Sequence, residues 1–78
     1  MAHFYFHVRE GQNLSLDPEG IELADETQAR EEAVKGARSL LSAAVCEGRL
    51  PLADAIVITD ETGHRVAEVR YGDAVRSD

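Results

Sequence analysis

Apolar and polar side chains alternate along the first nine residues of the chain. One face of this alternation carries Phe4, Phe6 and Val8, and the other carries His3, Tyr5, His7 and Arg9. A period of two residues is typical of a strand with one face buried. The pattern therefore predicts a strand from about Ala2 to Arg9, in the centre of its sheet.

A polar segment from Glu10 to Gly20 follows this strand. It ends in Asp17-Pro18-Glu19-Gly20, which has the residue preferences of a type I turn. Ile21–Leu23 is then a short second strand, paired antiparallel with the first. Leu14 and Leu16 either extend this ladder or plug one end of the core.

A helix is predicted after Asp25, which can cap it, with Gln28 at the spacing of a capping box. Gly48 is expected to end the helix with a left-handed residue. Apolar residues at spacings of three and four form one stripe, made of Ala29, Ala33, Ala37, Leu40, Leu41, Ala44 and Val45. Cys46 flanks this stripe and is expected to be a half-buried structural thiol. Gly36 is attributed to close approach of the helix to the sheet.

Two further strands are predicted as a hairpin, Ala55–Thr59 and Val66–Tyr71, around a turn at residues 60–63. One loop length sets Val66 opposite Ile58, and another sets Ala67 opposite Ile56. We favour an inward orientation for Ala67, Val69 and Tyr71, because it leaves the charged residues between them in water. Residues 75–78 are expected to fray.

The element order is therefore β-β-α-β-β in a single domain of residues 1–78. The predicted fold is an α+β two-layer sandwich. One antiparallel four-stranded sheet, with strand order 2-1-3-4, is covered on one face by a single helix. The other sheet face stays open, and it is the candidate interaction face. Its residues are Tyr5, His7, Arg9, Val57 and Thr59, with Val66 as a further candidate.

Composition narrows the classes of partner. The formal net charge is −7, and a field of that sign repels nucleic acid and anionic lipid. No apolar run approaches the roughly 20 residues that span a bilayer. The single cysteine and the lack of a secretory signal favour a reducing, cytoplasmic location. We expect no nucleic-acid and no membrane partner.

The chemistry-bearing residues do not form a recognisable site. His3 and His7 lie about 13 Å apart on one strand, too far to share a metal ion. Nothing in the spacing brings Cys46 to a histidine base, and the isolated glycines form no phosphate-binding loop. Paired carboxylates can do acid–base work or hold a hard cation, and an acidic cluster lies near one loop and helix start. Its spacing matches no calcium loop, and turn and cap chemistry already explains two of its members, Asp17 and Asp25. The cluster consists of Asp17, Glu19, Glu22, Asp25 and Glu26. We therefore expect no cofactor, no metal and no enzymatic activity.

The opening Tyr5-Phe6-His7-Val8-Arg9-Glu10-Gly11, followed by Asp17-Pro18-Glu19-Gly20, resembles a family of small bacterial proteins of unknown function. Its members open with Y-F-H-[VL]-R-[DE]-G. The resemblance implies a bacterial, cytosolic, single-domain protein and no particular activity. Asp25-Glu26-Thr27-Gln28-Ala29 also resembles the helix start of antitoxins with a partial ribonuclease-H-like fold. That second likeness concerns architecture alone.

These observations favour a non-catalytic protein-interaction module, including self-association through the open sheet face or an edge strand. The chain is short and its core is thin, so burial against a partner would add to its stability. An antitoxin-like regulator that binds a partner protein is the alternative hypothesis. A small-molecule-binding or catalytic domain is a third.

Overall fold

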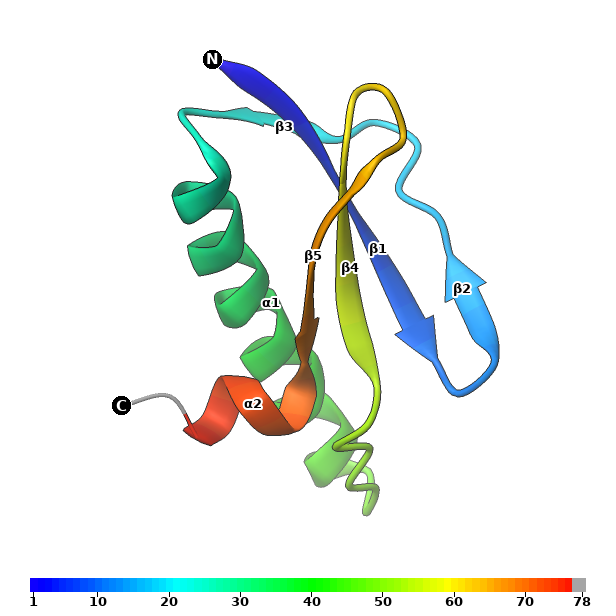
Figure 1. Ribbon diagram of the computed structural model, residues 1–78. Coiled ribbons are helices and arrows are strands. Elements are labelled where there is room, and N and C mark those ends of the chain that lie inside the picture. Colours follow the sequence, from blue (N-terminus) through cyan, green and yellow to red (C-terminus); the bar gives the residue numbers. More distant parts are fainter. Residues whose placement is uncertain (77–78) are drawn as a thin grey trace.

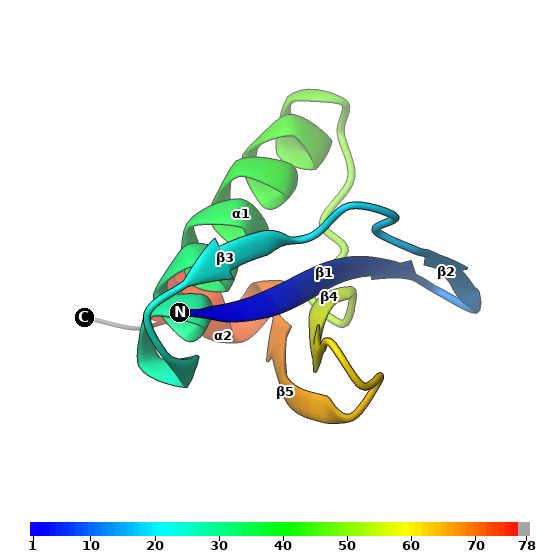
Figure 2. The same ribbon diagram turned by 90° about the horizontal axis from the view of Figure 1, so that it is seen from above.

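The computed structural model describes residues 1–76, and it contains five strands and two helices within them (Figure 1). In chain order the elements are β1 (Ala2–Glu10), β2 (Asn13–Ser15), β3 (Ile21–Leu23), α1 (Glu26–Cys46), β4 (Ala55–Asp60), β5 (Arg65–Arg70) and α2 (Tyr71–Arg76). Both helices lie on the same side of the sheet (Figures 1 and 2). The predicted α+β class and the two-layer arrangement are confirmed.

All strand pairs are antiparallel, and the order across the sheet is β2-β1-β4-β5 with β3 also paired to β1. The predicted order, with Ile21–Leu23 as the second strand, is therefore correct. The sheet has five strands and not four, because part of the polar segment forms β2. Leu14 pairs with Arg9 in that ladder. Leu14 and Leu16 are both exposed, so neither residue plugs the core.

Helix α1 begins and ends where the sequence predicts. The Asp25 side chain accepts a hydrogen bond from the backbone amide of Gln28 at 2.9 Å. Gly48, with a φ of 86°, follows the last turn. The buried stripe is narrower than expected, and consists of Ala29, Ala33, Ala37, Leu41 and Ala44. Leu40, Val45 and Cys46 are exposed, so their predicted places on or beside the buried stripe are wrong.

The narrow stripe follows from where α1 packs. The helix lies over β4 and β5, and at Gly36 an added Cβ would come within 3.1 Å of Ile56 Cδ1. The attribution of Gly36 to close approach is therefore supported. Phe4 is buried, but Phe6 and Val8 are only half-buried. A shallow groove of about 260 Å³ remains beside Phe6, between α1 and β3.

The β4–β5 hairpin pairs Ile58 with Ala67, a register that neither predicted loop length gives. One extra residue, Val66, is accommodated in β5 where the register shifts between Ile58 and Thr59. Ala67 and Val69 are buried, as predicted. Val66 packs against the core cluster, so its candidate place on the open face is wrong.

Tyr71 begins a second helix and does not end the last strand, which corrects the prediction. Its amide donates to the Asp54 carbonyl at 2.8 Å, and the Gly72 amide donates to the Leu52 carbonyl at 3.0 Å. The chain then leaves the sheet, and α2 packs against α1. Tyr71 is still buried, as expected. Residues 75–76 belong to α2 where fraying was predicted, and residues 77–78 lie outside the described part.

Candidate interaction face

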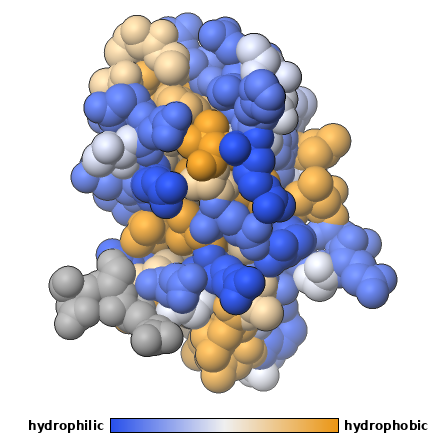
Figure 3. All heavy atoms as spheres, viewed as in Figure 1, coloured by the Kyte–Doolittle hydropathy of each residue, from blue (hydrophilic) through white to orange (hydrophobic). Residues whose placement is uncertain are grey.

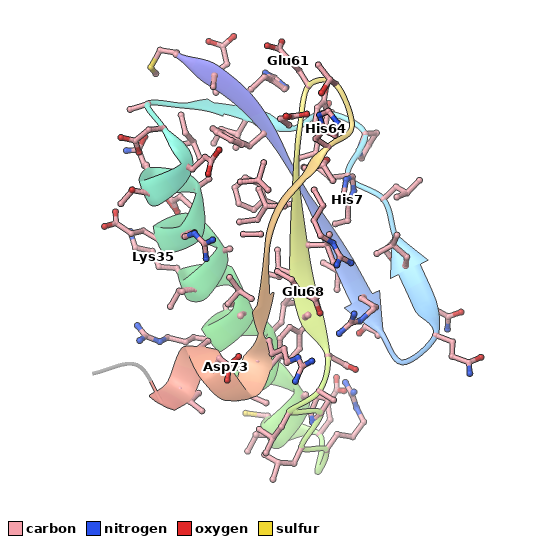
Figure 4. The ribbon with its side chains drawn as sticks, viewed as in Figure 1. His7, Lys35, Glu61, His64, Glu68 and Asp73 are labelled. Carbon is pink, nitrogen blue, oxygen red and sulfur yellow. The ribbon has the colours of Figure 1, made fainter. Side chains whose placement is uncertain are left out.

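The sheet face away from the helices brings together all five predicted site residues, Tyr5, His7, Arg9, Val57 and Thr59, here called the open face. The β1–β4 register sets Tyr5 opposite Thr59 and His7 opposite Val57. Neighbouring β5 adds Glu68, which is paired with Val57 and lies on the same side as His7 (Figure 4). No segment within residues 1–76 forms a layer over this face (Figure 2).

An ion pair holds the end of the open face that lies near the C-terminal end of β1. Arg9 Nη2 lies 2.7 Å from Glu68 Oε2, and it also donates to the Ala53 carbonyl at 3.2 Å. Arg65 approaches the second Glu68 oxygen at 3.4 Å. Partly exposed pairs of this kind contribute little to stability. They hold Arg9 flat across the sheet, and Val57 is buried to 7% exposure.

His7 occupies the centre of the open face with both ring nitrogens engaged. Its Nδ1 lies 3.0 Å from the backbone amide of Asp17, and its Nε2 lies 2.9 Å from Thr59 Oγ1. An amide can only donate, so Nδ1 must carry the lone pair and Nε2 the proton. Nε2 therefore donates to the Thr59 hydroxyl. The Tyr5 ring stacks parallel to the His7 ring, with centroids 6.3 Å apart.

The partner of His7, Asp17, also holds the outer edge of β1. This edge pairs with β3 at residues 2–4 and with β2 at residues 8–10. In the gap between them, the Phe6 amide donates to Asp17 Oδ2 at 3.1 Å. The amides of Glu19 and Gly20 donate to Oδ1, each at 3.2 Å. One carboxylate thus satisfies the edge that the two short strands leave open.

The same contacts set the pKa of the Asp17 carboxyl. Burial by itself raises this pKa, but hydrogen bonds from three backbone amides and the nearby His7 ring favour the charged form. Together these effects outweigh burial, so the pKa lies below its ordinary value of 3.8. The carboxylate is therefore charged at neutral pH.

A second histidine, His3, holds the end of the β2–β3 connection that lies next to β3. This connection is called the β2–β3 crossing below. His3 Nε2 lies 2.8 Å from the Glu19 carbonyl oxygen, and its ring contacts Tyr5 at a centroid distance of 5.0 Å. Gly20 has a φ of 67°, and a Cβ there would lie 2.6 Å from the Phe4 carbonyl oxygen. His3, His7, Asp17 and Gly20 thus position the β2–β3 crossing.

Other candidate chemistry is dispersed. Within residues 1–76, no three His, Cys, Asp or Glu side chains are grouped so that they could hold a metal ion. Asp17 and Asp25 of the acidic cluster act in the turn and in the helix cap. Across the same described residues, neither helix has the length and apolar character that crossing a bilayer requires.

The fold and this face define a small α+β protein with a five-stranded sheet that helices cover on one side. A family model described as a domain of unknown function (DUF6894) matches residues 3–72. The chain therefore belongs to the DUF6894 family, which agrees with the predicted membership of a family of unknown function. No curated protein and no solved structure matches the chain. The likeness to antitoxins stays a prediction.

Sequence reasoning selected the face but missed its two acidic partners, Asp17 and Glu68. The turn pattern accounts for Asp17 locally, but its carboxylate also accepts from the Phe6 amide, eleven residues away. The inward orientation of Ala67 and Val69 leaves Glu68 in water by prediction, but its carboxylate pairs with Arg9. The available signal was the alternation along β5, which places Glu68 on the same face as Arg9 once the register is known.

Proposed function

We propose that this chain is a non-catalytic protein-interaction module that binds a protein partner, including a second copy of itself, through the open face. The observation that carries the proposal is an uncovered sheet face whose side chains are already held in place. Arg9 is fixed by Glu68, and His7 by Asp17 and Thr59. A preorganised face loses little side-chain freedom when a partner binds.

The chemical character of the face also suits a protein partner. Tyr5 offers an aromatic ring and Arg9 a guanidinium, and aromatic residues and arginine are enriched in protein interfaces. The polar groups of His7, Thr59 and Arg9 bond to one another or to neighbouring backbone. This arrangement supports a binding surface more than a catalytic site, where polar groups converge on a substrate position.

The test is site-specific photocrosslinking in the native host. A benzophenone amino acid replaces Tyr5, which is already aromatic, and in a matched control it replaces Ser42 on the exposed side of α1. We expect discrete protein adducts from position 5 that the control lacks. An adduct of twice 8.5 kDa identifies self-association, and a heavier adduct identifies another protein. Equal labelling from both positions, or no adduct from position 5, contradicts the proposal.

A further inference from the structure

The two edges of the sheet carry opposite charge. From Glu10 to Ala29 the chain has six acidic residues and no lysine or arginine. This stretch includes the β3 edge, where Glu22 is exposed, and Glu32 of α1 lines the groove beside Ile21 on the same side. The edge formed by β3 is therefore acidic.

The β5 edge is mainly basic. Arg65 and Arg70 lie on β5, and both are exposed. The side of α1 that faces α2 adds further cations. Arg38 lies there, because its Nε donates to the Ala74 carbonyl at 2.8 Å. Arg30 and Lys35 line the same hollow as Arg38. Acidic residues on this side include Glu31, Asp73 and Glu68, and Glu68 already pairs with Arg9 and Arg65. Figure 3, in which β5 lies toward the viewer, shows mostly hydrophilic residues with separate hydrophobic patches.

Both edges have an outer side without a strand partner among the described residues. β3 pairs only with β1, and β5 pairs only with β4. The two strands form opposite edges of the sheet (Figure 2). Unpaired strand edges are templates for pairing with another chain. Ile21 on β3 is also half exposed.

The strand directions allow these two edges to meet. β3 and β4 both run antiparallel to β1, and β5 runs antiparallel to β4, so β5 and β3 have opposite directions. A second copy translated across the sheet therefore presents its β3 antiparallel to β5 of the first. The helices of both copies then lie on the same side.

The side chains also match across this junction. Glu22 pairs with His3, and Arg65 and Arg70 pair with Thr59 and Ala55, so all three charged residues lie on the side of the open face. Glu68 lies on the same side, but it already pairs with Arg9 at 2.7 Å and with Arg65 at 3.4 Å. The open-face side of β5 therefore keeps an excess of positive charge toward the Glu22 carboxylate of the next copy. Ile21 pairs with Phe4 and lies on the helix side, which is also the side of Ala67 and Val69.

We propose that copies of this chain associate head to tail, with the acidic β3 edge of one copy continuing the sheet beyond the basic β5 edge of the next. The contact is heterologous, so it builds rings or open chains and does not stop at a symmetric dimer. The inference goes beyond the proposed function, because it uses the sheet edges and leaves the open face accessible.

The test is sedimentation of the whole chain with charge-reversed edges. One variant combines Glu19→Arg with Glu22→Arg, and the other combines Arg65→Glu with Arg70→Glu. The control, Glu61→Arg, makes the same kind of change at the hairpin tip (Figure 4). β3 contributes only three residues, so the protein is examined at about 1 mM, where a weak complex with a Kd of that size is half formed. Each copy has a net charge of −7, so copies repel one another. About 0.1 M NaCl screens this repulsion beyond about 10 Å.

We expect wild type and Glu61→Arg to reach at least twice the monomer mass of 8.5 kDa, and to return to monomer at about 1 M NaCl. Each edge variant alone stays monomeric, because like charges then meet at the junction. An equimolar mixture of the two regains the higher mass, which a merely misfolded variant could not do. A monomeric wild type, or edge variants that associate like wild type, overturns the inference.

The proposed function is tested separately in the same experiment. Tyr5→Arg changes the open face and leaves both edges intact, so head-to-tail association persists in that variant. A dimer that Tyr5→Arg abolishes and the edge variants retain would support the open face and overturn the edge inference. Association that only the edge variants abolish supports the edges.

Discussion

Replacing Asp17 with alanine removes the one side chain that satisfies the β1 edge between β2 and β3. Three hydrogen bonds are lost, from the amides of Phe6, Glu19 and Gly20. A hydrogen bond contributes about 1 kcal/mol net, and more to a charged acceptor, although the Glu19 bond is exposed and counts for less. We therefore expect Asp17→Ala to lower the free energy of unfolding by about 2 to 3 kcal/mol at pH 7.

The pH dependence of this loss has a defined sign. Because the folded-state pKa of Asp17 lies below its ordinary value of 3.8, the stabilisation is fully present above pH 3.8. It disappears as the pH falls through the lower, folded-state pKa. The difference between wild type and Asp17→Ala therefore narrows as the pH falls below 3.8. Asp60, whose pKa is also lowered, contributes equally to both proteins and cancels.

Urea unfolding followed by far-ultraviolet circular dichroism measures this difference. With a denaturant slope of about 1 kcal/mol/M, the midpoint falls by about 2 M or more at pH 7. Asp73→Ala removes an exposed acidic group from α2 and should move the midpoint by less than about 0.5 M. In the variant, hydrogen exchange at the Phe6 amide should also accelerate. A loss below about 0.5 kcal/mol, or a loss independent of pH, would refute the assigned role of Asp17.

Three further substitutions test the fold by thermal or urea unfolding. Gly20→Ala should cost about 2 to 4 kcal/mol, because φ is positive and the new Cβ would lie 2.6 Å from the Phe4 carbonyl oxygen; a cost below about 1 kcal/mol would contradict that geometry. Asp25→Ala should cost about 1 kcal/mol through loss of the helix cap, and an unchanged stability would argue against capping. Tyr71→Phe should preserve stability or raise it by about 1 kcal/mol, since the buried hydroxyl has no partner within residues 1–76; a loss above about 1 kcal/mol would show that the hydroxyl is bonded.

The sequence predicts most of the fold because local patterns encode it. The alternation along β1, the cap at Asp25 and the glycine after α1 each have a local cause. The two missed elements have different causes. β2 closes a tight hairpin with β1, in which Glu10 pairs with Asn13, but its three exposed and mainly polar residues give only a weak strand signal. α2 packs against α1, which is distant in the sequence and not visible in a local pattern.

The residues whose burial is wrongly predicted share another cause. Leu40 and Val45 have helical spacing, but spacing does not tell how wide a stripe the sheet covers. The width depends on where α1 crosses the sheet, and α1 lies over β4 and β5. Val66 was misplaced for a similar reason, since one bulged residue reverses the expected face.

Residues 5–11, which carry the opening motif, serve mainly to hold β1 and the segments beside it in place. The Phe6 amide and the His7 ring hold Asp17, and the Gly11 amide donates to Asp54 Oδ1 at 3.0 Å. Substitutions at these positions would alter binding by moving the β2–β3 crossing, so they cannot separate recognition from folding. Tyr5 differs, because within residues 1–76 its side chain makes ring contacts and no hydrogen bond. A loss of binding caused at Tyr5 in a fully folded variant therefore reports on the open face itself.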